Sequence, residues 1–228
     1  MTVEPSAGAV RVHPLARTIG LTGLVGTVVL FVALGTSTPG EPPTDATTAA
    51  AADFLRGLDG TWVRLGEVVA DIAMFAVLWF MVGFALLLRR VEGDLPWRST
   101  MAGLSGLLVA AFVILDSSEE AASHRAADLD QGQLAYAYDV TTIGFTNIWL
   151  PLGGFALACG WVILSSGALP RWLGWWGVVS GIGLALAQFV WEIPIWLIPY
   201  AAFWIWLLTT CVLLVRRPVG GADGVTRR

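Results

Sequence analysis

Six apolar stretches, each long enough to cross a lipid bilayer, occupy most of this 228-residue chain. A spanning helix needs roughly 20 apolar residues, and lipid cannot satisfy unpaired backbone groups, so stretches of this length fold as helices. They run approximately over residues 18–35, 68–88, 99–116, 143–164, 172–190 and 193–215. The sequence therefore predicts an all-α polytopic membrane bundle of six transmembrane helices.

The basic residues predict how this bundle is oriented. One face would carry most of the arginines, namely Arg11, Arg17, Arg89, Arg90, Arg98, Arg171, Arg216, Arg217, Arg227 and Arg228, and the other only Arg56, Arg64 and Arg125. Because basic loops stay in the cytoplasm, both termini are expected there, in a protein of the inner or plasma membrane. The expected parts are a cytoplasmic segment 1–17, a membrane domain 18–217 with outer segments 36–66 and 117–140, and a cytoplasmic tail 218–228. A cleaved signal peptide is an alternative interpretation of the first stretch.

The acidic residues gather on the opposite, outer face, where Glu41, Asp45, Asp53, Asp59, Glu119, Glu120, Asp128 and Asp130 lie. An acidic face attracts cations and repels nucleic acid. The expected partners are therefore the bilayer and a cation or small amphipathic molecule, with a homo-oligomer or a membrane partner as further options and no nucleic acid. In the outer segment 36–59, Asp45 is expected to cap a short helix that lies across the mouth of the bundle.

Residue types that the chain lacks exclude several classes of membrane protein. There is no lysine, so neither a retinal Schiff base nor a lysine nucleophile can form. His13 and His124 lie outside the apolar stretches, which excludes a haem held within the membrane by two histidines. Cys159 and Cys211 form no Cys-x-x-Cys pair and are interpreted as packing residues. No cofactor is expected, apart from a weakly supported divalent metal.

Two parts of the chain are similar to each other. Gly-Phe-Ala-Leu occurs at 83–86 and again at 154–157, and a Leu-Pro turn precedes the following apolar stretch in both places, at 95–96 and 169–170. This pattern suggests a tandem parallel repeat of two helical hairpins, related by an axis along the membrane normal. The alternative is that any good turn at a membrane surface uses proline and tryptophan.

Several motifs resemble those of a family of uncharacterised bacterial multi-pass membrane proteins, a domain of unknown function. They are Tyr138-Asp139 with Phe145 and Pro151-Leu152, the turn Leu-Pro-Arg-Trp-Leu-Gly at 169–174, and Phe203-Trp204 before the final Arg216-Arg217. The likeness covers roughly 50–217. It implies a polytopic helical fold and carries no activity.

Ionisable side chains inside a membrane are costly, so they are the first candidates for a functional site. Asp71 lies about one turn inside the second stretch, with Glu67 four residues earlier and Arg64 three before that. Helical spacing places all three on one face, and an ion pair between Asp71 and Arg64 is the structural alternative to a site.

A weaker candidate is a metal site formed by Asp116, Glu120 and His124 at the end of the third stretch. These residues recur at intervals of four, so a continuous helix would present two carboxylates and an imidazole on one side. Charged residues on a solvated helix extension are the more common explanation of such spacing.

Further polar residues fall at the same membrane level. Asp139 is expected to cap the fourth helix, Asn147 lies two turns deeper, and Gln188 and Glu192 end the fifth helix. Together they predict an outward-opening acidic cavity, lined by Glu67, Asp71, Asp116, Asp139, Asn147, Gln188 and Glu192, with Trp149 among the central tryptophans able to attract a cation. The leading hypothesis is a transporter or sensor that binds a cation or small amphipathic ligand. The alternatives are an intramembrane acid–base enzyme acting on an isoprenoid or lipid and a structural membrane subunit.

Overall fold

The chain folds into helices throughout the part that the structure describes. The computed structural model describes residues 9–37, 40, 46–58, 60–115 and 118–216, and these contain no strand. The elements are α1 (Ala9–Ser37), α2 (Thr48–Gly57), α3 (Thr61–Glu92), α4 (Trp97–Leu115), α5 (Ser118–His124), α6 (Gln131–Asn147), α7 (Trp149–Ser166), α8 (Arg171–Ala187), a 3-10 turn (Pro194–Trp196) and α9 (Leu197–Arg216). The predicted all-α class is confirmed.

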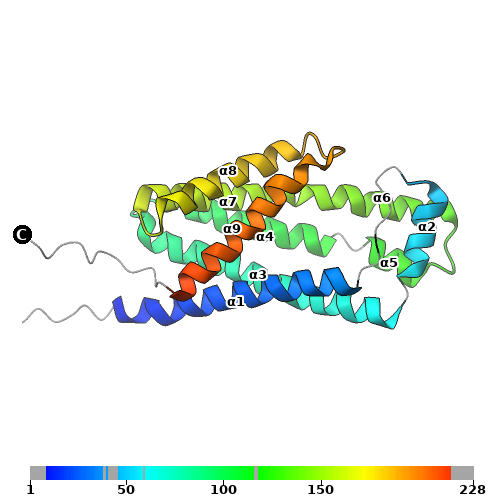
Figure 1. Cartoon of the computed structure of the whole chain (residues 1–228), viewed down its shortest axis with the longest axis horizontal. Helices are drawn as coiled ribbons and strands as arrows, with labels where there is room; N and C mark the ends of the chain where they lie inside the picture. The colour runs from blue at the N-terminus through cyan, green and yellow to red at the C-terminus, as the bar shows by residue number, and fades with distance from the viewer. Residues whose placement is uncertain (1–8, 38–39, 41–45, 59, 116–117, 217–228) are drawn as a thin grey trace, which may run out of the picture.

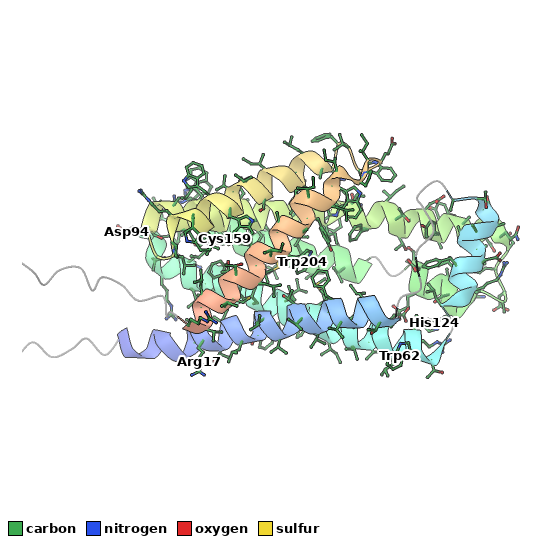
Figure 2. All side chains as sticks on the ribbon, in the orientation of Figure 1. Arg17, Trp62, Asp94, His124, Cys159 and Trp204 are labelled. Carbon is green, nitrogen blue, oxygen red and sulfur yellow. The ribbon has the colours of Figure 1, made fainter. Side chains whose placement is uncertain are left out.

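The long helices run side by side along the longest axis of the molecule, and α2 lies across one end of them together with α5 (Figure 1). Arg17 and Asp94 lie toward the opposite end, whereas His124 and Trp62 lie beside α2 and α5 (Figure 2). We call the end with Arg17, Arg89, Arg90, Arg98, Arg171 and Arg216 the arginine end, and the end with α2 and α5 the acidic end. The beginning of α1 and the end of α9 both lie at the arginine end (Figure 1).

Five helical segments among the described residues are long and apolar enough to cross a membrane: Leu15–Ser37, Thr61–Glu92, Trp97–His124, Gln131–Ser166 and Pro194–Arg216. They indicate an integral membrane protein. Helix α8 has 17 residues, or about 26 Å, which is shorter than the roughly 30 Å hydrocarbon core. The prediction of six spans is therefore not confirmed.

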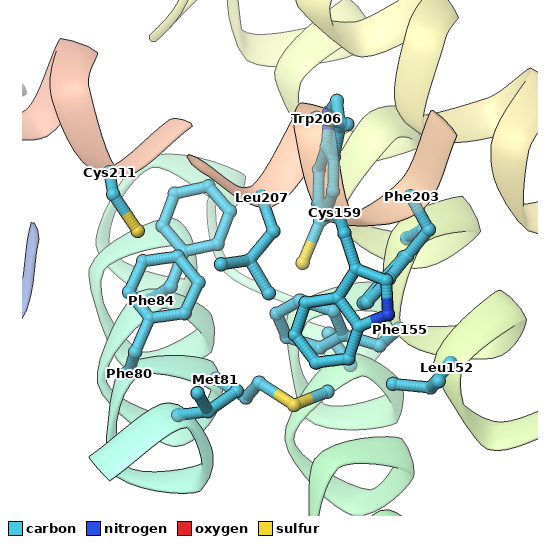
Figure 3. Packing of buried hydrophobic residues seen from close by; sticks show 14 of the residues in the cluster. Phe80, Met81, Phe84, Leu152, Phe155, Cys159, Phe203, Trp206, Leu207 and Cys211 are labelled. Atoms are coloured by element: carbon cyan, nitrogen blue, oxygen red, sulfur yellow. The ribbon is translucent and has the colours of Figure 1, made fainter. Parts of the chain in front are cut away.

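Aromatic side chains connect three helices in the core of the bundle (Figure 3). The ring centroids of Phe80 and Phe84 on α3 lie 5.6 Å apart, those of Phe84 and Phe155 on α7 lie 6.4 Å apart, and those of Phe155 and Trp206 on α9 lie 6.1 Å apart. The Trp206 indole Nε1–H also donates to the backbone oxygen of Leu173 on α8, at 3.0 Å. A buried indole needs such a partner, and this one ties α8 to α9.

Helices α7 and α8 approach each other closely because glycines face each other across their interface. A Cβ built on Gly160 of α7 would lie 2.5 Å from the backbone oxygen of Gly174 on α8. A Cβ on Gly181 of α8 would likewise lie 2.5 Å from the backbone oxygen of Gly153 on α7. Small residues allow this contact of backbones within a membrane, where packing replaces the hydrophobic effect as the force between helices.

The Leu-Pro-Arg-Trp-Leu-Gly turn has a structural role in this hairpin. Gly167 ends α7 in the left-handed conformation (φ +68°), which glycine adopts without a steric cost. Pro170 stands at the N-cap of α8, Leu173 is fully buried, and Gly174 makes the close contact with α7. The structure does not confirm the tandem repeat, which stays a prediction.

The buried carboxylate of Glu92, at the end of α3, forms hydrogen bonds with the first turn of α4 at the arginine end. The Oε1 atom of Glu92 accepts hydrogen bonds from the backbone N and the Nε of Arg98, both at 2.9 Å, and its Oε2 accepts from the backbone N of Ser99 at 2.8 Å. Arg98 in turn donates to the Ser165 hydroxyl of α7 at 3.0 Å and lies over the ring of Trp161. Glu92 thus satisfies backbone donors in the first turn of α4, which a helix would otherwise leave unpaired.

Helices α2, α5 and the first half of α6 form a small helical cap with its own apolar core. Its buried side chains are Ala51, Ala52, Leu55, Leu58, Ala122, Leu134 and Tyr138. The expected short helix across the mouth of the bundle is thus present, but its N-cap is Thr47, and Asp45 lies outside the described residues. The N-cap expected at Asp139 is also wrong: Asp130 caps α6 by a reciprocal pair of hydrogen bonds with Gln133, and Asp139 is exposed in the middle of α6.

Candidate functional site

A cavity of about 220 Å³ lies within the bundle, in the half nearer the acidic end. It is lined by Leu30, Phe31 and Leu34 of α1, by Ala70, Asp71, Met74, Val77 and Met81 of α3, by Val109 and Val113 of α4, by Phe145, Ile148 and Leu152 around the junction of α6 and α7, and by Tyr200 and Trp204 of α9. Its walls are almost entirely apolar. Asp71 is the one ionisable carboxylate in this lining.

Asp71 forms no hydrogen bond or ion pair with any residue that the structure describes, so the expected ion pair with Arg64 is not formed. Its position is set by α3, which carries it about ten residues past the N-terminal end of the helix. The negative charges of Glu120 on α5 and of Glu67 one turn away act on this part of α3. A carboxylate in these surroundings attracts a positively charged group.

Aromatic rings stand on the wall of the cavity that α9 contributes. Trp204 meets Phe31 of α1 edge to face with centroids 5.1 Å apart, and it meets Tyr200 at 6.0 Å. Tyr200 also lies 5.6 Å from Phe145. The indole Nε1 of Trp204 is buried and has no hydrogen-bond partner. The cavity wall thus presents several π faces, to which positively charged groups are attracted.

The sequence contains a signal for this wall, and Trp204 is one of the central tryptophans expected to be able to attract a cation. Trp196, Tyr200 and Trp204 are spaced four residues apart, which places their side chains on one face of a helix. The structure shows consecutive ring contacts along this stripe, at 5.9 Å and 6.0 Å. The spacing predicts the stripe, but it does not predict that the stripe faces Asp71.

The other residues predicted to line the site are dispersed. Glu67 is partly buried on α3 outside the cavity lining, and Asn147 and Glu192 are exposed. Gln188 ends α8 and donates from Nε2 to the Thr146 hydroxyl at 3.3 Å, which leaves its buried Oε1 without a partner. The predicted set therefore does not line one cavity in this structure.

Trp149 lies behind the cavity wall. It is fully buried, stacks on Trp196 with centroids 5.0 Å apart and meets the cavity residue Phe145 edge to face at 5.8 Å. Its indole Nε1 has no hydrogen-bond partner. Trp149 therefore supports the aromatic wall.

The weak metal-site hypothesis rests on three residues, of which Asp116 lies outside the described part of the chain. His124 Nε2 and Glu120 Oε1 are 3.8 Å apart on α5, and both side chains are substantially exposed. Within the described ranges no group of three or more His, Cys, Asp or Glu side chains comes close enough to hold a metal. The metal site stays a prediction.

Comparison with known families gives one match, which covers residues 18–216 and therefore most of the chain. Its description is a domain of unknown function, DUF4386. The chain belongs to the DUF4386 family. No curated protein and no solved structure matches it.

Membership of DUF4386 confirms the resemblance to an uncharacterised family and extends it. The resemblance was expected from about residue 50, whereas the family match begins at residue 18 and includes the described apolar part of α1. Helix α1 packs along α3 over much of its length (Figure 1) and contributes Leu30, Phe31 and Leu34 to the cavity. The cavity is thus built entirely from residues inside the DUF4386 match.

Proposed function

We propose that this DUF4386 protein binds a small organic cation in the cavity between α1, α3 and α9, as a transporter or a sensor. The observation that supports this proposal is the placement of Asp71, an exposed carboxylate without a partner among the described residues, in the lining of an apolar cavity with aromatic walls. Opposite charges attract, and the apolar and aromatic walls beside Asp71 exclude part of the surrounding water, so this carboxylate can favour an organic cation.

The chemistry of the walls indicates an organic cation and not a divalent metal. Tyr200, Trp204, Phe31 and Phe145 offer rings, to which alkylammonium groups bind by cation–π attraction. A divalent metal needs several oxygen or nitrogen ligands, whereas this lining offers a single carboxylate. The cavity is smaller than the roughly 300–1,000 Å³ typical of sites for drug-sized ligands, so the ligand is small.

The negative charges at the acidic end of the bundle favour the approach of a cationic ligand from this end. Glu67 and Glu120 lie close enough to interact with each other, and Glu120 also acts on Asp71. Negative charges arranged along an approach raise the local concentration of cations and the rate of their binding. The cap formed by α2, α5 and the first half of α6 lies at this end of the bundle, where it can cover the entrance (Figure 1).

The test compares Asp71→Asn with Asp139→Asn, which changes an exposed carboxylate outside the cavity lining in the same way. Tetramethylammonium should raise the thermal unfolding temperature of the purified wild type and of Asp139→Asn. In Asp71→Asn its affinity should fall about fivefold, since losing one charge interaction of a partly solvated carboxylate costs about 1 kcal/mol. Unfolding temperatures without ligand show whether each variant is folded.

Three outcomes would contradict the proposal. Equal stabilisation of the wild type and Asp71→Asn would show that Asp71 does not hold the ligand. Equal stabilisation by Na⁺ at the same concentration would show that the aromatic walls play no part. Turnover of a lipid or isoprenoid that Asp71→Asn abolishes would replace binding by an intramembrane acid–base enzyme.

We also propose that the arginine end faces the cytoplasm and that α8 is a sixth crossing. Helix α8 runs beside α7 in the direction of the acidic end, and α9 then runs back to the arginine end (Figure 1). Trp172 lies in the first turn of α8 and Trp191 lies four residues after its end, as expected for tryptophans at the two membrane interfaces, and a bilayer can thin locally around a short helix. A reporter fused after residue 125 should then report an extracytoplasmic location, and a cytoplasmic signal would refute this orientation.

A further inference from the structure

A second and larger cavity, of about 710 Å³, lies on the side of the bundle between α1 and α4. Helix α3 forms its floor, with Phe75, Leu78, Trp79, Val82, Gly83, Leu86, Leu87, Arg89 and Arg90, while Leu15 and Ile19 of α1 and Leu107 and Ala110 of α4 form its walls. We call it the side groove. It shares no residue with the Asp71 cavity, so the two can be tested separately.

The length and composition of the side groove suit an acyl chain. Arg89 lies fourteen positions after Phe75 on α3, which corresponds to about 21 Å along the helix. One leaflet contributes about 15 Å of hydrocarbon. Phe75, Trp79 and Leu86 are all more than half exposed in the groove, so an extended chain would find apolar contacts over a whole leaflet.

Two arginines stand where this groove meets the arginine end. Arg89 and Arg90 are exposed and form no hydrogen bond or ion pair with another residue that the structure describes. The nearby Arg98, in contrast, is held by Glu92 and Ser165. Guanidinium groups bind phosphate through two parallel hydrogen bonds, and at a membrane surface they attract anionic lipids.

A smaller cavity of about 180 Å³ adjoins the side groove at the same arginine. It lies between α3 and α4, includes Ser99, Thr100 and Gly103, and shares Val82, Leu86, Arg89 and Leu107 with the side groove. Two apolar depressions therefore converge on Arg89. This is the arrangement that a lipid with two acyl chains and one charged headgroup requires.

We propose that the side groove is a binding site for an anionic phospholipid, with the phosphate on Arg89 and Arg90, one acyl chain along Trp79 and Phe75, and the second chain in the cavity between α3 and α4. Because the apolar groove extends well beyond the arginines, the ligand is the whole lipid and not a free phosphate ion. The proposal requires that the helices span a membrane, and it is independent of the cation site.

The test is native mass spectrometry of the purified full chain, titrated with phosphatidylglycerol and with phosphatidylcholine that carry identical acyl chains. Wild-type protein should retain phosphatidylglycerol preferentially. The double variant Arg89→Gln with Arg90→Gln should weaken this binding about thirtyfold, from about 1 kcal/mol for each arginine near an anionic lipid. Ala110→Trp, which fills the groove from the α4 wall, should weaken it without any change of charge.

The matched control is Arg171→Gln with Arg216→Gln, which removes two exposed arginines at the same end but outside both cavities. It should retain the wild-type preference. An equal loss in this control would show general charge attraction and overturn the proposal, as would equal retention of the two lipids. Displacement of phosphatidylglycerol by inorganic phosphate at a similar concentration would also overturn it, because the acyl chains would then contribute nothing.

Discussion

Replacing Gly160 by alanine is expected to lower the stability of the bundle by about 2 kcal/mol, even though alanine is the better helix former by about 1 kcal/mol. The reason is the absence of space. The added Cβ would lie 2.5 Å from the backbone oxygen of Gly174 and 2.8 Å from the backbone nitrogen of Val178. Neither atom belongs to a side chain that can rotate away, so α7 and α8 must separate. Thermal unfolding in detergent measures the loss.

Gly103→Ala is the matched control, because it is also a glycine inside a helix of the bundle. Its added Cβ would meet only the Cβ of Ala85, at 3.7 Å, which is an ordinary contact. We expect this variant to unfold at or above the wild-type temperature. If Gly160→Ala and Gly103→Ala unfold at the same temperature, the close α7–α8 packing is wrong. Gly181→Ala repeats the test from the other helix, where the added Cβ would meet the backbone oxygen of Gly153.

Leu55→Asp is expected to unfold the cap and leave the membrane bundle folded. Leu55 is fully buried in the apolar core that α2 shares with α5 and α6. Truncating such a leucine alone costs about 2–5 kcal/mol, and an unpaired carboxylate in its place adds the cost of removing a charge from water. Because the core of the cap contains few residues, this loss exceeds what its remaining contacts can offset.

Hydrogen–deuterium exchange tests this prediction element by element. Amides of α2 should lose their protection in Leu55→Asp, while those of α7 and α8 should keep it. Ala49→Asp is the control, since Ala49 is exposed on the same helix and a carboxylate in the first turn is favourable. If α2 remains protected in Leu55→Asp, the cap core is not what holds this helix.

The cap and the helices around the Asp71 cavity are held together by different apolar cores. The cavity lies among long helices that pack through aromatic and small side chains, whereas the cap has a separate and smaller core. Parts of a protein with few buried contacts open most readily. If the cap covers the entrance, its opening limits access to Asp71, so Leu55→Asp should speed the binding of tetramethylammonium without changing which variants bind it.

The sequence alone was sufficient for the local properties of this protein. The apolar stretches predicted helices close to the observed ones, because the need to satisfy the backbone in lipid depends on length and composition alone. The junction between α6 and α7 falls at Ile148, shortly before Pro151, which cannot donate a hydrogen bond to Asn147. The resemblance to an uncharacterised family likewise depended on short motifs that can be read along the chain, and the family match confirms it.

Which residue caps the start of a helix was harder to predict from the sequence, because it depends on where the first turn begins. Both Asp130 and Asp139 are suitable N-caps by residue type, and Asp130 takes the position because the helix begins earlier than the apolar stretch. On α2 the helix begins two residues later than expected, and the Thr47 hydroxyl accepts a hydrogen bond from the backbone N of Ala50. Hydrophobic periodicity marks where a helix is buried, and the polar first turns of α6 give no such signal.

Only the tertiary structure decided which residues share a site. Asp71 was identified from its depth in an apolar stretch, but its neighbours Tyr200 and Trp204 belong to the last helix, and Glu192 and Asn147, which were expected beside it, lie outside the cavity lining. Helical spacing fixes which side chains share a face of one helix. It does not fix how each helix is rotated about its axis, because that depends on contacts between helices far apart in the chain, such as the close approach of Gly160 and Gly174.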